Sequence, residues 1–198
     1  MTDKSYGESG YSLVDRITIK ARRKHAHHTI LEYIRRTKNQ EFHLIELGCG
    51  FRGENLLSLS NEYPNASFTG VDIKVTNEYP KHIQLIEMDL NHESINKKFD
   101  VILSLAVVEH LENPLNHFQH IRELAHKDTL VGLTTPTPQS NLPWTILKDL
   151  NLIDSGQIHV SYLTEDGIKL LSEKCGLVVC EYRKFELGLN QFVMLQLK

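Results

Sequence analysis

Three acidic residues lie at or close to the ends of three successive predicted strands. Glu46 stands in H-L-I-E-L-G-C-G, Asp72 in F-T-G-V-D-I and Asp89 in I-E-M-D-L. Parallel strands of an α/β sheet bind their ligands outside their carboxyl ends. We therefore expect the three carboxylates to gather at one edge of a sheet, where each can accept hydrogen bonds from a ligand.

A glycine-rich turn separates the first of these strands from the helix that follows. Glycine has no side chain, so Gly48, Gly50 and Gly53 permit a tight turn and let a ligand approach the backbone closely. The spacing Gly48-x-Gly50-x-x-Gly53, with Asp72 downstream, also satisfies the dinucleotide-binding fingerprint. The glycines alone therefore leave NAD and S-adenosylmethionine open as cofactors.

Three features favour S-adenosylmethionine. Glu46 stands two residues before Gly48, where a carboxylate can meet the methionine ammonium group but would be badly placed against a pyrophosphate. Asp89 can accept a hydrogen bond from the adenine amino group. The chain also leaves room for one sheet only, without the substrate domain that is common in dehydrogenases. S-adenosylmethionine is therefore the expected cofactor.

The same segments resemble the class I (Rossmann-like) S-adenosylmethionine-dependent methyltransferases. E-L-G-C-G is similar to their first motif, F-T-G-V-D-I to their second-strand motif and M-D-L to their adenine-edge motif. F-D-V-I-L-S-L-A-V-V-E-H-L-E-N-P resembles the fourth-strand segment of the small-molecule branch that includes the ubiquinone-pathway O-methyltransferases. One departure lies in the glycine turn, where Arg52 occupies the usual position of the third glycine and Gly53 comes one residue later.

This resemblance implies an α/β fold with a seven-stranded, mostly parallel sheet, an antiparallel C-terminal hairpin and helices on both faces. It also implies that Asp72 binds both ribose hydroxyls and that Ile73 lies against the adenine ring. The cofactor-binding residues expected from the motifs and the resemblance together are Glu46, Gly48, Gly50, Asp72, Ile73, Asp89, Leu90 and Leu105.

The candidate catalytic residues, Glu109 and His110, follow the fourth predicted strand. Histidine is the side chain best suited to take a proton near neutral pH, and a general base helps when the methyl acceptor is a hydroxyl. A structural role for His110, packed over the cofactor, is the alternative. In related enzymes the pattern E-x-x-E-H supplies metal ligands, but here Ala106 stands in place of the first acid. We therefore expect no metal site.

A loop-rich segment over residues 135–164 is expected to form a substrate-side loop or lid. It carries Trp144, His159 and Tyr162, which could line an acceptor pocket or form a small core of the lid itself.

The N-terminal helical region, residues 11–38, is rich in basic and histidine residues. His25, His28 and Glu32 would share one face of a helix and form a possible metal-ligand set. The surrounding lysine and arginines would repel a cation, which favours a solvated basic face instead. Arg16, Arg22 and Arg23 could cover the cofactor, face an acidic acceptor or lie in solvent.

Length and patterning predict a single domain over the whole chain of 198 residues, with residues 1–10 as a loose tail. No apolar run approaches the ~20 residues of a membrane helix. The three cysteines match neither a zinc site nor a disulfide framework. Together these features predict a cytoplasmic protein. Alternating patterns predict strands at 42–47, 67–71, 83–88, 100–105, 129–134, 177–185 and 191–197, and helices at 53–62, 114–126 and 165–175.

The expected function is methyl transfer from S-adenosylmethionine to a hydroxyl of a small molecule or a glycan. The glycan possibility comes from T-T-P-T-P and F-E-L-G-L-N-Q, which faintly resemble methyltransferases of polysaccharide synthesis. An RNA 2′-O-methyltransferase is one alternative, against which the net charge of −3 and the missing metal acid argue. A non-catalytic cofactor-binding partner subunit is the other, against which the retained acids Glu46, Asp72 and Asp89 argue.

Overall fold

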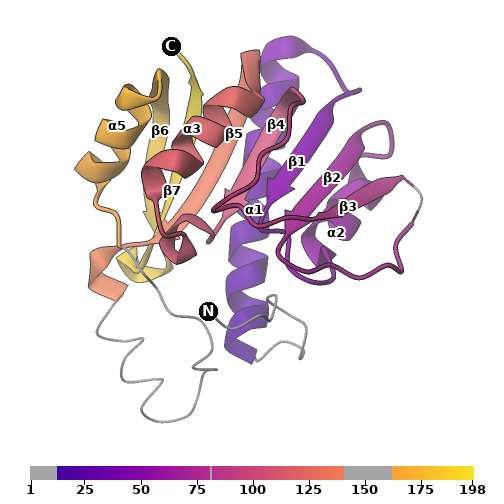
Figure 1. The fold of residues 1–198 in the computed structure, drawn as a ribbon, viewed down its shortest axis with the longest axis horizontal. Coiled ribbons are helices and arrows are strands. Elements are labelled where there is room, and N and C mark those ends of the chain that lie inside the picture. Colours follow the sequence, from indigo (N-terminus) through magenta and orange to yellow (C-terminus); the bar gives the residue numbers. More distant parts are fainter. Residues whose placement is uncertain (1–12, 81, 141–161) are drawn as a thin grey trace.

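One seven-stranded sheet forms the centre of the molecule, in the order β3-β2-β1-β4-β5-β7-β6 (Figure 1). The computed structural model describes residues 13–80, 82–140 and 162–198. β1 to β5 pair in parallel, and β7 pairs antiparallel with both β5 and β6, so β7 runs opposite to the other six strands of the sheet. The strands are β1 His43–Leu47, β2 Ser67–Asp72, β3 Ile83–Glu87, β4 Phe99–Leu105, β5 Ala125–Pro136, β6 Leu177–Phe185 and β7 Asn190–Leu197.

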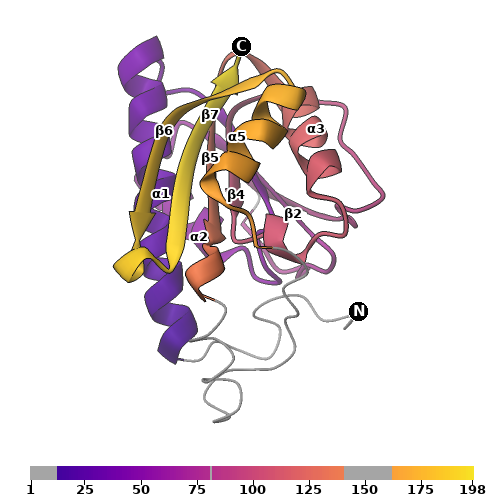
Figure 2. The same cartoon turned by 90° about the vertical axis from the view of Figure 1, so that its left-hand side faces the viewer.

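Helices cover both faces of the sheet (Figures 1 and 2). α1 (Leu13–Thr37) and α2 (Glu54–Glu62) lie on one face, and α3 (Pro114–Leu124) and α5 (Glu165–Lys174) lie on the other. Short 3₁₀ turns are η1 (Val108–His110), η2 (Pro138–Ser140) and η3 (Glu186–Gly188). The expected mostly parallel α/β architecture with its antiparallel C-terminal hairpin is confirmed. No helix within the described ranges has the length and apolarity needed to cross a bilayer.

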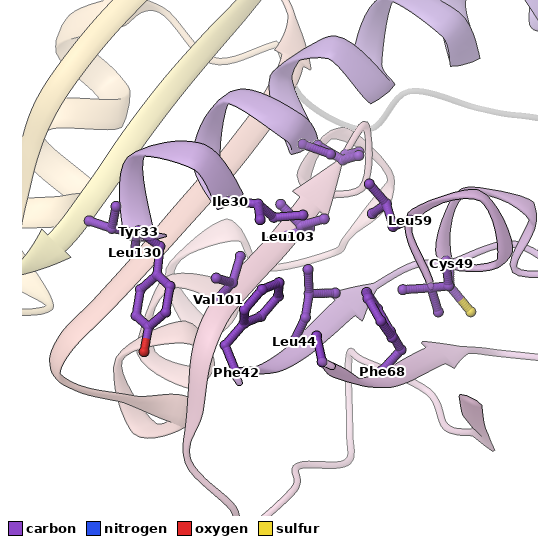
Figure 3. Close-up of a cluster of buried hydrophobic side chains, with 14 of the residues drawn as sticks. Ile30, Tyr33, Phe42, Leu44, Cys49, Leu59, Phe68, Val101, Leu103 and Leu130 are labelled. Atoms are coloured by element: carbon purple, nitrogen blue, oxygen red, sulfur yellow. The ribbon is translucent and has the colours of Figure 1, made fainter. Parts of the chain in front are cut away.

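Alternation along the central strand β4 explains why its sequence is almost continuously apolar. Val101 and Leu103 face α1 and pack with Ile30 and Leu44 (Figure 3), whereas Ile102 faces α3. A parallel strand that is covered on both faces buries every side chain, so both sets of positions must be apolar. These two cores hold the carboxyl ends of the strands in fixed relative positions.

The junction between α3 and β5 differs from the sequence prediction. We expected a helix to residue 126 and a strand from residue 129, but α3 ends at Leu124 and β5 begins at Ala125. The Thr129 hydroxyl donates to the Phe99 carbonyl (2.6 Å) and accepts from the His126 amide (2.8 Å). The contact with Phe99 ties Thr129 to the start of β4, whereas the contact with the His126 amide lies within β5 itself; a local sequence pattern reveals neither.

The N-terminal basic region forms one continuous helix, α1. The predicted tail at residues 1–10, Trp144, His159 and most of the expected lid fall outside the described residues.

Candidate cofactor and active site

The turn after β1 depends on glycine at three positions. Gly48, Gly50 and Gly53 have φ values of +72°, +76° and +50°, a region that residues with side chains adopt only with strain. The amides of Gly48 and Cys49 both donate to the Val71 carbonyl, at 2.7 and 3.0 Å, which fixes the turn against the end of β2. Gly53 is also the N-cap of α2, so the glycine one residue later than usual still begins the helix.

Glu46 is a buried carboxyl beneath this turn, 3% exposed. Its Oε1 accepts a hydrogen bond from Asn55 Nδ2 at 2.8 Å, and Oε2 has no partner among the described residues. Burial raises the pKa of Glu46 to about 8, and the nearby Asp72 carboxylate acts in the same direction. A buried oxygen without a partner costs free energy, so it is a candidate acceptor for a ligand donor.

Asp72 ends β2 directly beside the same turn. Its Oδ2 accepts from the Gly50 amide at 2.7 Å and its Oδ1 from the Ile73 amide at 2.9 Å. A carboxylate oxygen can accept more than one hydrogen bond, so Asp72 is a candidate acceptor for ligand hydroxyls. The side chain of Ile73 is 44% exposed beside it, although it is apolar.

Asp89 follows β3, one strand farther from the turn. Its Oδ1 accepts from the Asn91 amide at 2.9 Å and from Asn91 Nδ2 at 3.0 Å. Leu90 is partly buried and packs against the apolar core. The structure thus places Glu46, Asp72 and Asp89 along three adjacent strands at one edge of the sheet, as the sequence predicts.

These residues fit S-adenosylmethionine. Oε2 of Glu46, which has no partner among the described residues, suits an ammonium group, the carboxylate of Asp72 suits a ribose diol, and the exposed Ile73 suits the face of adenine. A pyrophosphate would meet a buried carboxyl at Glu46 instead of free backbone amides.

The segment after β4 packs directly on the glycine turn. Leu105 ends the strand at 9% exposure, and Ala106 then adopts φ +57°, with its amide donating to the Thr134 carbonyl (2.9 Å). This reversal places Val107 against Gly48 so closely that a Cβ on Gly48 would lie 2.4 Å from Val107 Cγ2. The 3₁₀ turn η1 therefore begins at the residue directly after Val107, which contacts the glycine turn.

The two catalytic candidates on η1 differ sharply in exposure. Glu109 is 1% exposed, and its Oε2 accepts from the Thr135 hydroxyl at 3.1 Å. Burial raises the pKa of Glu109, whereas the charges of His110 and Arg22 oppose that shift. His110 ends η1 and is half-buried. The pKa of Tyr162 is raised mainly by burial and secondarily by the charge of Glu109. Tyr162, which lies near the C-terminal end of the expected lid, is therefore close enough to this site to interact with it electrostatically.

The histidine-rich face of α1 does not form a metal site. His25 is buried between Phe185 and Phe192, with ring centroids 4.4 and 4.6 Å away, and burial lowers its pKa to about 4. His28 instead contacts Glu181 at 2.7 Å, and Glu32 binds Arg35 and Arg36. The expectation of a solvated face is wrong for His25. No three metal-ligating side chains converge in the part of the chain that the structure describes.

Two residues of the site were not predicted from the sequence. Asn55 binds Glu46, and Thr135 binds Glu109. Asn55 is the second residue of α2, directly after the glycine turn. A polar residue at this position can turn back toward the preceding strand, and this is the sequence signal that could have identified it. Thr135 lies 26 residues from Glu109 and carries no local signal.

A family model described as a methyltransferase domain matches residues 19–182. No curated protein sequence matches the chain significantly. The plantazolicin methyltransferase BpumL is similar in structure, with a TM-score of 0.68, 16% identity, and coverage of 94% of this chain and 91% of that one. Magnesium protoporphyrin IX methyltransferase from Synechocystis PCC 6803 gives a TM-score of 0.65 and 17% identity over 98% of this chain and 91% of that one.

The mitomycin 7-O-methyltransferase MmcR gives a TM-score of 0.60 and 16% identity, and 79% of this chain matches 49% of that one. This chain therefore spans about half the length of that enzyme. Both the glycine turn with its flanking acids and the match of the family model over most of the chain lead to one assignment. The chain belongs to the methyltransferase-domain family and is a class I, S-adenosylmethionine-dependent methyltransferase.

Proposed function

We propose that this protein methylates a hydroxyl group of a small molecule or a glycan, with His110 as the general base. The observation that carries this proposal is the packing of the segment after β4 against the glycine turn at the Val107–Gly48 contact. Val107 contacts the glycine turn, and the half-buried imidazole of His110 lies on η1, the short turn that follows Val107 directly.

The cofactor contacts that we propose follow from the geometry of the turn. Glu46 accepts from the ammonium group, Asp72 accepts from the ribose hydroxyls, and Asp89 accepts from the adenine amino group. Ile73, Leu90 and Leu105 contact the adenine from its apolar sides, while Gly48 and Gly50, both at positive φ, form the tight turn whose backbone lies along the cofactor. S-adenosylmethionine, when bound, supplies a methyl group on a positively charged sulfur.

His110 then acts on the acceptor. As the acceptor oxygen forms its bond to the methyl carbon and the carbon–sulfur bond breaks, the hydroxyl proton passes to the imidazole. Glu109 is too deeply buried to meet an acceptor at the surface, and its charge interacts with that of His110. We assign Glu109 a positioning role: it is held by Thr135 and, in its ionised form, stabilises the imidazolium. Much of the remaining rate comes from holding donor and acceptor in line.

The test compares His110→Gln with the unaltered protein, using labelled S-adenosylmethionine and separate pools of phenols, sugars and oligosaccharides. We expect the unaltered protein to label at least one hydroxyl-bearing pool and His110→Gln to lower the rate by roughly 10²- to 10⁴-fold. Binding of S-adenosylhomocysteine should stay within about twofold. His43→Gln, an exposed histidine at the opposite end of β1, is the matched control. Full activity of His110→Gln would refute its role as base.

The same experiment includes RNA as an acceptor pool. Labelling of RNA with salt-dependent binding would favour the 2′-O-methyltransferase alternative, and cofactor binding without transfer to any pool would favour a non-catalytic partner subunit. We further propose that the protein acts in the cytoplasm, because Cys49, Cys175 and Cys180 are all free thiols.

A further inference from the structure

A hydrogen-bonded relay connects α1 to the buried acid beneath the glycine turn. Arg23 Nε donates to Asn55 Oδ1 at 3.3 Å, and Asn55 Nδ2 donates to Glu46 Oε1 at 2.8 Å. The guanidinium group is a donor only, so the amide oxygen of Asn55 must face Arg23 and its NH₂ group must face Glu46. Arg23 therefore determines the orientation of the Asn55 amide.

The relay leaves one atom of Glu46 for a ligand. Oε1 is engaged by Asn55, while the buried Oε2 has no partner among the described residues. We propose that Asn55 and Arg23 are positioning residues for the cofactor: Arg23 orients the Asn55 amide, which holds one oxygen of Glu46 and presents the other to the ammonium group. This inference rests on the proposed contact between Glu46 and that ammonium group.

The charges around Glu46 make this presentation dependent on protonation. Burial raises the pKa of Glu46 to about 8, and Asp72 from β2 adds to the shift, whereas Asn55 from α2 and Arg23 from α1 oppose it. The Cys49 thiol of the turn is close enough for Glu46 to raise its pKa. In the ligand-free protein, burial therefore favours the protonated form of Glu46 near neutral pH. When the ammonium group binds, this proton leaves to solvent and a carboxylate–ammonium pair forms.

The relay should have its largest effect on ligand affinity at low pH. Below pH 8 the ligand must bind as Glu46 ionises, and the Asn55 hydrogen bond lowers the cost of that ionisation. Loss of the Asn55 hydrogen bond raises the pKa of Glu46 further. Once the pH exceeds that raised pKa, Glu46 is ionised before the ligand binds, and the cost of ionisation no longer weakens binding. A variant that loses the relay should therefore bind poorly at pH 6–7 and recover relative affinity toward pH 9.

The experiment measures dissociation constants by calorimetry for two ligands, S-adenosylhomocysteine and 5′-methylthioadenosine, which lacks the amino-acid part. We expect Asn55→Leu to weaken S-adenosylhomocysteine binding about 10-fold at pH 6.5 and 5′-methylthioadenosine binding by less than twofold. Arg23→Gln, on a partly exposed helix position, should give the same pattern at about threefold. Lys24→Gln, an exposed neighbour on α1, is the matched control and should change neither ligand.

Glu46→Gln separates failure of the relay from failure of the contact on which it rests. If Glu46→Gln weakens S-adenosylhomocysteine alone but Asn55→Leu weakens both ligands equally, or neither, the relay is overturned and the contact stands. If Glu46→Gln itself affects the two ligands equally, the contact is overturned and the relay with it. A deficit for Asn55→Leu that does not shrink between pH 6.5 and 9 would also overturn the proposal. No arm uses a methyl acceptor, so the result is independent of the proposed hydroxyl substrate.

Discussion

The contact between Gly48 and Val107 permits a quantitative test of how the two halves of the site are held together. In Gly48→Ala the new Cβ would lie 2.4 Å from Val107 Cγ2, and the backbone would keep a φ of +72°. The left-handed conformation costs an alanine about 1–2 kcal/mol, and overpacking of a buried contact costs about 1–3 kcal/mol. We expect Gly48→Ala to lower the free energy of unfolding by about 2–5 kcal/mol.

Gly188→Ala separates these two costs. Gly188 has a φ of +86°, but a Cβ there would meet nothing within 4 Å. Its substitution should therefore cost about 1–2 kcal/mol from backbone strain alone. The difference between the two variants then measures the steric conflict with Val107.

The assay is urea unfolding followed by circular dichroism, together with the melting temperature and the dissociation constant for S-adenosylhomocysteine. For a chain of this size, Gly48→Ala should lower the melting temperature by roughly 5–20 °C. The double variant Gly48→Ala/Val107→Ala should be at least ~1 kcal/mol less destabilised than the sum of the single variants, because the smaller side chain removes the clash. Ligand binding should weaken in Gly48→Ala and recover partly in the double variant.

Two results would refute this reasoning. If Gly48→Ala costs no more than Gly188→Ala, the turn does not press on Val107. If the double variant is simply additive, the cost arises elsewhere than at this contact.

Two further predictions concern stability away from the cofactor. Asp100→Asn should lower the free energy of unfolding by about 1–3 kcal/mol, because Asp100 accepts from the His43 amide (2.7 Å), the Tyr33 hydroxyl (2.9 Å) and His126 Nε2 (3.1 Å). The affinity for S-adenosylhomocysteine, measured by calorimetry, should not change. A marked loss of affinity would contradict the placement of the site at the other end of β4. Burial lowers the pKa of His25 from 6.5 to about 4. As the pH falls, His25 is therefore protonated in the unfolded chain before it is protonated in the folded protein. The free energy of unfolding should fall by up to ~3 kcal/mol as the pH decreases from 6.5 to 4. His25→Phe removes the titrating group and should flatten that part of the curve of unfolding free energy against pH, and an unchanged slope would show that His25 is not the cause.

Local patterns in the sequence predict most of the sheet. β6 has its predicted bounds, and β1, β2, β3, β4 and β7 differ from theirs by one residue at one end. β1, β2, β4 and β7 are buried over most of their length, so their apolar runs directly reflect their environment. β5 is the exception: Ala125 and the residues from Leu130 onward pair with β4, and the polar residues His126, Lys127 and Asp128 lie in the irregular stretch between them, where no apolar pattern marks a strand.

The sequence by itself determined the fold class, the glycine turn and the acids at the strand ends, because each depends on short-range spacing along one strand and the turn after it. Only the tertiary structure decided the state of those groups. Glu46 lies 9 residues from Asn55, and Asn55 lies 32 from Arg23, yet the three side chains form one hydrogen-bonded chain. Burial and partners of this kind arise when separate helices pack on one sheet, and they set which oxygen of Glu46 faces a ligand and at what pH it is ionised.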